Sequence, residues 1–514
     1  YLRRVRTASG ATAMQIVEKD HGVRRIVEHL GSAHDEAELA ALMAAGRDRL
    51  TAAAQPMLDF GVGALTQPAV VQHQRSRLLV DAIVSGWRAL GFDVVDDEAF
   101  FQLVLARIVE PTSMLDSARV LADVELEPVH RSTMKRCLRR IAERGYRDQF
   151  AAACHAHWLR QGHATLVLYD VTTLYFEAEH EDGLRKVGYT KERRVDPQIV
   201  VGLLVDRQGF PLEIGSWEGN RAETTTILPT IEAFRERHHL SDIVVVADAG
   251  MLSMKNLTAL DEAGLKFIVG SRTVKAPSDL ASHFRWHGDA FTDGQLVDTI
   301  TPRDTTAAAR NANNPRQKAE PVWDPDTYPS SWRAVWDYRH QRALRDRRTL
   351  TAQENRARAV VAGEKTTRSP RFVTISKNQV VLDESSLARA RKLVGLKGYL
   401  SNIPVSMMPA QEIVDSYHDL WHVEQSFRMS KHDLRARPIF HHQTDAIQAH
   451  LTIVFTALAI SRWLQSTTGM TVKKLVRLLR PLREITITIG GQTITAQPQL
   501  DPHTANLITK ITGH

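Results

Sequence analysis

The stretch that decides the fold class is ATLVLYDVTTLYFEAE, residues 164–179, whose apolar and β-branched side chains predict a strand. The segment DPQIVVGLLVDRQGFPLEIGSWEGN, residues 196–220, follows it and predicts a hairpin with its turn at residues 206–209. Helices and strands then alternate, and they are expected at residues 224–238, 243–247, 254–263 and 266–270. Three antiparallel strands followed by alternating helices and strands is the element order of the ribonuclease H fold. The sequence therefore predicts an α/β protein with a ribonuclease H-like core.

Regions of different composition surround this core. Consecutive helices are expected before it, and a long arginine-rich segment separates its first part from a final helical part. The predicted domains are a small N-terminal α/β module at 1–70, a helical, DNA-binding region at 71–160, the first part of the core at 161–270, a basic insertion domain at 271–404, the second part of the core at 405–470 and a C-terminal region at 471–514.

The composition excludes several classes of protein. The chain has 514 residues, of which 43% are hydrophobic and 24% charged, so it can bury real cores and is not expected to be disordered. Its most apolar stretch, residues 451–464, is too short for a transmembrane helix, and the basic first residues are not followed by the apolar run of a secretory signal. The two cysteines, Cys137 and Cys154, exclude a disulfide scaffold and a cysteine-based zinc site. We expect a cytoplasmic protein without a membrane partner.

The charge is distributed unevenly. The formal net charge is +7, and residues 271–400 contain about 23 Lys and Arg against 14 Asp and Glu, which exceeds the net charge of the whole chain. A basic region of this kind is typical of a protein that binds a polyanion such as DNA. The alternative is a solvated, arginine-rich helix surface, and composition leaves both interpretations open.

Two short helices in the N-terminal half resemble a helix-turn-helix. They are expected at residues 112–121 and 132–141, and a polar connector joins them. The second helix carries four basic residues that are candidates for contact with DNA, namely Lys135, Arg136, Arg139 and Arg140. Any all-helical bundle offers such pairs of helices, so a purely structural role remains the alternative.

Two aspartates are candidates for catalysis. Asp170 is predicted to end the first core strand, and Asp248 directly follows the strand IVVVA. The ribonuclease H order makes these strands neighbours, so the two carboxylates can converge at one end of the sheet. Each aspartate alone could be a turn residue or a helix N-cap, but their joint placement favours a site.

A third element is the predicted helix QEIVDSYHDLWHVEQSFRMSKHDL, residues 411–434. Tyr417, Glu424, Arg428 and Lys431 are spaced so that they share one helix face. A polar face is usually only solvated. Here apolar residues flank it, so part of the helix must be buried, and this favours a functional interpretation.

Together these motifs resemble the transposases of the insertion-sequence-four superfamily. The pattern Tyr417-x6-Glu424-x6-Lys431 resembles the family signature Tyr-x2-Arg-x3-Glu-x6-Lys, and the segments around Asp170 and Asp248 look like the two Asp motifs of that group. The resemblance extends over about residues 75–465. Leu420 stands at the Arg position of the signature, so the DNA contact of that Arg cannot be carried over, although Arg428 lies one turn beyond Glu424 and could replace it.

The resemblance implies a DDE-type DNA transposase. Asp170 is expected to bridge two Mg²⁺ ions, with Mn²⁺ as a substitute, while Asp248 and Glu424 each complete one ion. Tyr417 and Lys431 are expected to hold phosphate oxygens of double-stranded DNA. The implied activity is cleavage at terminal inverted repeats and joining of 3′-hydroxyls to target DNA, through hairpin ends. A homodimer or higher assembly on paired ends, in the bacterial nucleoid, is also implied.

The predicted insertion domain contains three tryptophans in a basic setting, Trp323, Trp332 and Trp336. Related transposases use a tryptophan of the insertion domain to stack on a flipped base, so all three are candidates. The alternative is that Trp332 and Trp336, four residues apart, pack one helix face.

Two other functions remain possible on the sequence. One is a ribonuclease H-like nuclease without strand transfer. The other is a catalytically inactive DNA-binding regulator derived from a transposase, against which the three acidic residues at the motif positions argue.

Overall fold

The computed structural model describes residues 1–7, 11–20, 23–34, 36–54, 70–162, 166–177, 180–188, 195–240, 242–251, 253–304, 316–365, 371–376, 379–489 and 492–513. The chain divides into two compact units. One comprises Tyr1–Val70 with Ile487–Ile494, and the other comprises Val71–Thr486 with Thr495–His514.

The smaller unit contains an antiparallel sheet and one helix. Strands β1 (Leu2–Arg6), β2 (Thr12–Asp20) and β3 (Val23–Ala33) pair in the order β1-β2-β3, and α1 (Glu36–Ala54) packs on β2 and β3. Ala13, Met14 and Val17 of β2 are buried, so the middle strand carries the core of this unit.

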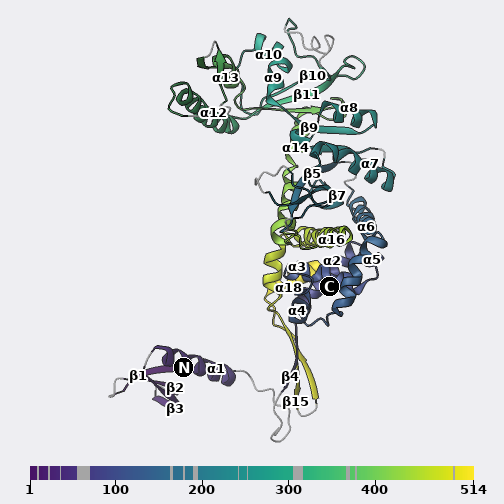
Figure 1. Cartoon of the computed structure of the whole chain (residues 1–514). Coiled ribbons are helices and arrows are strands. Elements are labelled where there is room, and N and C mark those ends of the chain that lie inside the picture. The colour runs from purple at the N-terminus through teal and green to yellow at the C-terminus, as the bar shows by residue number, and fades with distance from the viewer. Residues whose placement is uncertain are drawn as a thin grey trace. The chain divides into compact units, whose positions relative to one another are not determined.

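The larger unit is built on an eight-stranded mixed sheet (Figure 1). The strand order is β10-β11-β14-β9-β8-β5-β6-β7, and β8 pairs in parallel with both β5 and β9. The strands span β5 (Leu166–Tyr175), β6 (Gln198–Asp206), β7 (Pro211–Glu218), β8 (Val244–Ala247), β9 (Lys266–Ser271), β10 (Leu296–Pro302), β11 (Ser331–Tyr338) and β14 (Leu396–Ser401). Every residue of β6 and β8 is buried, which explains why the run IVVVA has no polar alternation.

Residues 271–404 contribute strands to the central sheet. Strands β10, β11 and β14 belong to residues 271–404, yet they extend the same sheet beyond β9. Residues 331–338, which include the two tryptophans considered above as one helix face, form β11, because the alternating pattern SWRAVWDY pairs with β10 and β14. The next helix, α12, begins at His340. The domain boundaries proposed within residues 71–514 stay a prediction.

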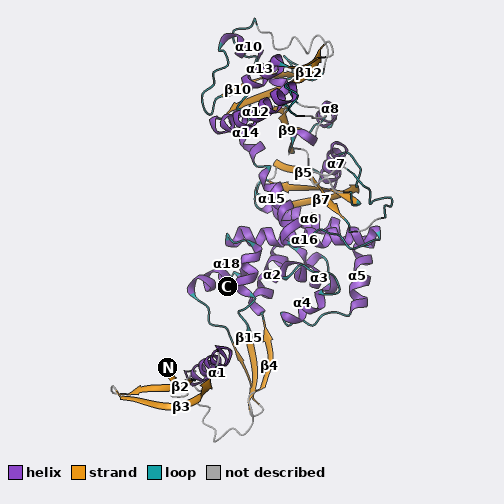
Figure 2. Cartoon of the chain, turned by 60° about the vertical axis from the view of Figure 1, so that its left-hand side comes forward, coloured by secondary structure: helices purple, strands orange, loops and turns teal. Residues whose placement is uncertain are grey.

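A group of helices packs against the edge strand β7 through α6 and α16. They are α2 (Arg77–Ala89), α3 (Glu98–Val109), α4 (Ser117–Asp123), α5 (Arg131–Glu143), α6 (Tyr146–Arg160), α16 (Thr444–Thr468), α17 (Val472–Leu479) and α18 (Pro502–Thr512). Figures 1 and 2 show α16 between β7 and the helices α2 and α3, and it contacts all three.

The long helix α16 was expected to be a short apolar stretch. It is 25 residues long and apolar enough to cross a membrane, but 89% of its most apolar window is buried inside the protein. That burial is what a central core helix requires, so its hydrophobicity is explained by packing against α2, α3, α5 and β7.

The remaining elements are further helices and two small sheets. They are α7 (Ile227–His238), α8 (Met254–Glu262), α9 (Ala276–Asp279), α10 (Ala281–Trp286), α12 (His340–Val361), β12 (Val373–Ser376), β13 (Gln379–Leu382), α13 (Glu384–Lys392), α14 (Ala410–His418), α15 (Trp421–Arg428) and the π-helical turn η5 (Met429–Asp433), together with β4 (Val70–Arg75), β15 (Glu484–Ile489) and β16 (Gln492–Ala496), which form a three-stranded sheet.

Candidate active site

Two parallel strands bring Asp170 and Asp248 together. In the register of β5 and β8, Tyr169 lies opposite Ala247, so the next residue on each strand is one of the two aspartates. Neighbouring strands are about 4.8 Å apart, which places the two backbones within reach of one cation pair. Asp170 does not end its strand as expected, because β5 continues to Tyr175 through its pairing with β6.

The third acid comes from a helical segment that is broken twice. Residues 411–434 were expected to form one helix, but α14 ends at His418, α15 begins at Trp421, and η5 follows as a π-helical turn. Tyr417 therefore lies in the last turn of α14 and Glu424 in the first turn of α15. Tyr417 and Glu424 still line one pocket, whereas Lys431 contacts Thr172.

The three carboxylates line one pocket. Its volume is about 270 Å³, and its walls are Tyr169, Asp170, Asp248, Lys397, Tyr417, His418, Leu420, Trp421, Val423 and Glu424. The side chains of Asp248 and Glu424 are exposed, whereas Asp170 is half-buried. Three carboxylates in a solvent-accessible pocket are hard oxygen ligands of the kind that Mg²⁺ and Mn²⁺ prefer.

Tyr417 contacts a carboxylate. Its hydroxyl donates to Asp248 Oδ1 at 2.7 Å, and the amide of Ala249 donates to the same oxygen at 2.7 Å. No hydrogen bond to Oδ2 is found among the described residues, so the second oxygen of Asp248 remains for a cation. Burial, followed by the hydrogen bond to Asp248, raises the pKa of Tyr417. The hydroxyl therefore stays protonated and acts as a donor.

A glycine on β9 makes this approach possible. A Cβ atom at Gly270 would lie 2.6 Å from the Tyr417 hydroxyl and 3.1 Å from Ala249 Cβ. Both distances are shorter than ordinary van der Waals contact, so only glycine lets α14 approach the sheet closely enough for the tyrosine to reach Asp248.

Lys397 is a site residue that the sequence reasoning missed. It lies on β14, lines the carboxylate pocket, and places its ammonium 4.4 Å from the centre of the Tyr417 ring. Burial lowers the pKa of Lys397, the charge of Arg342 acts in the same direction, and the carboxylates of Asp248 and Glu424 oppose both. The sequence LKGYLS offered one signal, a lysine inside an otherwise apolar strand.

The two other basic residues of the segment have different surroundings. Lys431 donates to the Thr172 hydroxyl on β5, two residues beyond Asp170, and it is half-buried. Arg428 is exposed at the end of α15. Leu420, at the position where the superfamily signature has Arg, is buried and forms part of the pocket wall.

The candidate recognition helix divides into two sets of residues. Arg140 forms an ion pair with the buried Asp97 at 2.7 Å, and Asp97 also accepts from the Tyr146 hydroxyl and caps α3 at the Phe100 amide. The guanidinium of Arg140 is therefore used inside the protein, which argues against its assignment to DNA. Lys135, Arg136 and Arg139 are exposed on α5 and remain candidates.

The three tryptophans are packing residues in this structure. Trp323 is 3% exposed, and Trp332 and Trp336 are fully buried. Trp323 donates to the Ser331 carbonyl at 2.9 Å, while the guanidinium of Arg303 lies 3.5 Å from the Trp332 ring centre. The suggestion that one of these rings receives a flipped base is not supported, since no ring face is accessible. The alternative of a shared helix face is also wrong in one respect, because Trp332 and Trp336 lie on β11.

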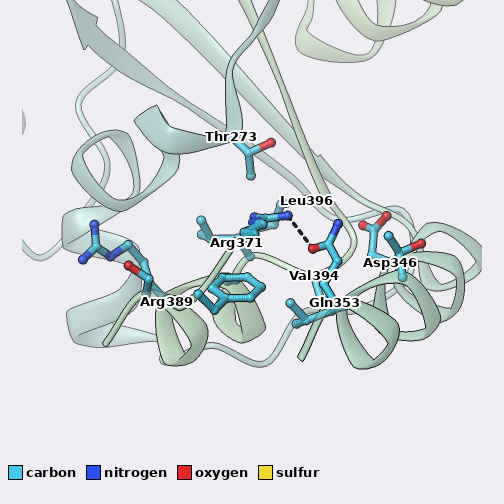
Figure 3. A pocket seen from close by; sticks show the side chains of 13 residues that line it. Thr273, Asp346, Gln353, Arg371, Arg389, Val394 and Leu396 are labelled. Carbon is cyan, nitrogen blue, oxygen red and sulfur yellow. Dashed lines mark hydrogen bonds between the residues drawn. The ribbon is translucent and has the colours of Figure 1, made fainter. Parts of the chain in front are cut away.

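A second pocket, of about 480 Å³, lies between α12 and α13 (Figure 3). Arg371 crosses it, donating to Gln353 at 2.8 Å and lying 4.6 Å from the ring centre of Phe372. Phe372 is only 7% exposed, so this pocket also lacks an open aromatic face. No residue predicted as a site residue lines it.

The mixed sheet and the convergent carboxylates define a protein with a candidate divalent-cation site. Residues 161–460 match the family described as "Transposase DDE domain", which is more than half of the chain, so the protein belongs to that family. No curated protein shows significant similarity to the sequence. Among solved structures, the cryo-EM structure of a piggyBac transposase synaptic complex with hairpin DNA is similar with a TM-score of 0.40 and 10% identity, over 79% of this chain and 77% of the other.

Proposed function

We propose that the protein is a DNA transposase of the insertion-sequence-four superfamily, with a ribonuclease H-like core. It binds the terminal inverted repeats of an insertion sequence, cleaves the element ends and joins the 3′-hydroxyls to target DNA. The observation that carries the proposal is the convergence of Asp170, Asp248 and Glu424 on one pocket, within the region that matches the DDE family.

The three carboxylates would hold two Mg²⁺ ions. Asp170 would serve both ions, and Asp248 and Glu424 would each complete one. When bound, the ions supply positive charge to the attacking and leaving oxygens of the phosphodiester. Tyr417 holds Asp248 through Oδ1, which would leave Oδ2 to bind an ion.

Basic residues next to the pocket would position the DNA backbone. Lys397 lies in the pocket wall beside the carboxylates and can donate to a phosphate oxygen held there. Lys431 and the exposed Arg428 follow the same helical segment and would hold phosphates further along the strand. Lys135, Arg136 and Arg139 on α5 would contact the inverted repeat.

The assembly and the reaction pathway are further parts of the proposal. Paired element ends need at least two protomers, so a dimer or larger complex on DNA is proposed, acting in the bacterial nucleoid. Cleavage through hairpin ends is proposed from the superfamily resemblance. With all three tryptophans buried, any base flipping would use another residue.

Strand-transfer assays test this function. Candidate inverted-repeat duplexes are incubated with the protein and Mg²⁺, and nicked, hairpin and joined products are separated on denaturing gels. Asp170→Asn, Asp248→Asn and Glu424→Gln should abolish nicking and joining while end binding in gel shifts is retained. Nicking without joining, on correct ends, would instead identify a nuclease. Loss of binding together with activity in all three variants would assign the carboxylates a folding role.

A further inference from the structure

A cluster of metal-ligating side chains lies outside the carboxylate pocket. His283 lies on α10, His287 directly follows that helix one turn later, and Glu320 comes from the segment that precedes β11. All three line a pocket of about 460 Å³, and none of them lines the pocket of Asp170, Asp248 and Glu424. The cluster is thus separate from the site proposed for transposition.

The geometry suits a single metal ion. One ligand atom from each residue lies within 4.8 Å of the other two, and His283 Nδ1 is 2.8 Å from Glu320 Oε1. Ligand atoms around tetrahedral Zn²⁺ are about 3.3 Å apart at metal–ligand distances of about 2.0–2.1 Å. His287 is exposed, so a change of its rotamer can close the remaining gap.

The central histidine is held rigidly and is incompletely paired. His283 is 5% exposed, and its ring stacks on Phe291 at 5.0 Å. Its Nδ1 faces Glu320, while its buried Nε2 has no hydrogen-bond partner among the described residues. A neutral imidazole has one N–H and one lone pair, so the contact with Glu320 uses only one of the two nitrogens. Nδ1, which faces Glu320, is therefore the nitrogen of His283 that can bind a cation together with that carboxylate.

The neighbouring charged residues leave the three side chains available to a metal ion. Asp298 lines the same pocket, but its carboxylate accepts from Arg333 at 3.0 Å and is neutralised there. The ligand set is therefore two imidazoles and one carboxylate, with an open fourth position toward the pocket. Imidazole ligands favour Zn²⁺ and similar transition ions, whereas Mg²⁺ prefers oxygen.

We infer that His283, His287 and Glu320 form a Zn²⁺ site. The ion joins the end of α10 to the segment that leads into β11, and so it stabilises the part of the sheet built by residues 271–404. It takes no part in phosphodiester chemistry, because its residues lie outside the carboxylate pocket.

The test is zinc binding by the full-length protein. The protein is stripped with EDTA, dialysed into buffer with 10-fold excess Mg²⁺ over protein, and titrated with ZnCl₂ against a chromogenic chelator, while the thermal unfolding midpoint is followed in parallel. One Zn²⁺ per chain and a higher midpoint are expected. His287→Ala and Glu320→Gln should weaken binding at least tenfold and remove the rise in the midpoint. His287 is exposed, and Glu320→Gln keeps the size and shape of a half-buried side chain, so both variants are expected to fold.

Two controls separate this site from other sites. His503→Ala removes an exposed histidine elsewhere and should leave zinc binding unchanged. Asp248→Asn should also bind one Zn²⁺ with unchanged affinity, even though it loses transposition. The inference is overturned if the wild-type protein binds no Zn²⁺, if His287→Ala and Glu320→Gln bind it as the wild type does, or if Asp248→Asn loses it.

Discussion

Replacing Tyr417 with Phe tests the innermost contact of the proposed site. The substitution removes one hydroxyl and keeps the ring, so the contacts of the ring with Tyr399, at 4.9 Å, and with Lys397 remain. What is lost is the 2.7 Å hydrogen bond to Asp248 Oδ1. Asp248 keeps the hydrogen bond from the Ala249 amide, but this single hydrogen bond no longer fixes the orientation of its carboxylate.

The size of the effect follows from the charge on the acceptor. A hydrogen bond to a charged group contributes about 1.5–3 kcal/mol. If that contribution is lost at the chemical step, the cleavage rate should fall about 10- to 150-fold, since each 1.36 kcal/mol is a factor of ten. Because Oδ2 would no longer be directed toward the ion, the Mg²⁺ concentration at half-maximal rate should rise as well.

The assay is single-turnover nicking of a labelled inverted-repeat duplex over a range of Mg²⁺ concentrations, with DNA affinity measured by fluorescence anisotropy. Tyr399→Phe is the matched control, because its buried hydroxyl donates to Asp337 at 3.3 Å and contacts no carboxylate of the pocket. A Tyr417→Phe variant with normal nicking and Mg²⁺ dependence would refute the positioning role. Weaker binding to all DNA at unchanged Mg²⁺ dependence would instead show that the hydroxyl holds a phosphate, as the sequence suggested.

Three further predictions concern the wider structure. Lys397→Met should reduce nicking about tenfold at saturating DNA, because a cation beside the reacting phosphate is removed, and normal nicking would exclude this lysine from the site. Arg139→Ala should weaken binding to every duplex and lower the salt dependence of DNA affinity by about one in log–log slope. Arg140→Ala should instead lower the unfolding free energy by about 3 kcal/mol, because Asp97 loses its partner. The structure would be contradicted if anisotropy and urea unfolding showed the reverse pattern. Burial, followed by the charges of Arg107 and His441, lowers the pKa of His450 from 6.5 to about 3. The neutral form of His450 therefore stabilises the fold fully above pH 6.5. Between pH 6.5 and about 3 the unfolding free energy should decrease by about 1.4 kcal/mol per pH unit, because the unfolded chain binds a proton that the folded protein does not. His450→Gln should flatten this part of the stability profile, and an unchanged slope in urea titrations at pH 4–7 would contradict it.

Local patterns in the sequence were sufficient for much of the core. The order of strands and helices from β5 to β9 could be predicted, because period-2 and continuous apolar runs report directly on strands that are half or fully buried. The same runs placed Asp170 and Asp248 on neighbouring strands. Only the position of Asp170 within its strand was misjudged, because where β5 ends depends on its partner β6.

The sequence predicted that Glu424 lies near the two aspartates, and it lines their pocket, but the shape of its helix could not be predicted. Periodicity predicts one continuous helix, whereas the segment is divided into α14, α15 and the π-helical turn η5. In this structure Tyr417 reaches Asp248 and Lys431 reaches Thr172. A change from α-helical to π-helical hydrogen bonding is not visible in a local repeat of side chains.

The partners of individual side chains were decided by the tertiary structure alone. Lys397 joins the carboxylates because β14 pairs with β9 across more than a hundred residues of chain, and the pairing of β14 with β11 places Trp336 against Gly398. Arg140 reaches Asp97 because α5 packs on α3, and His283 meets Glu320 from a segment 37 residues further along the chain. A sequence pattern specifies which face of a helix or strand is apolar. Whether a charged or aromatic side chain on that element finds a favourable partner depends on the side chains of the neighbouring element. Long-range strand pairing and packing determine which element that neighbour is.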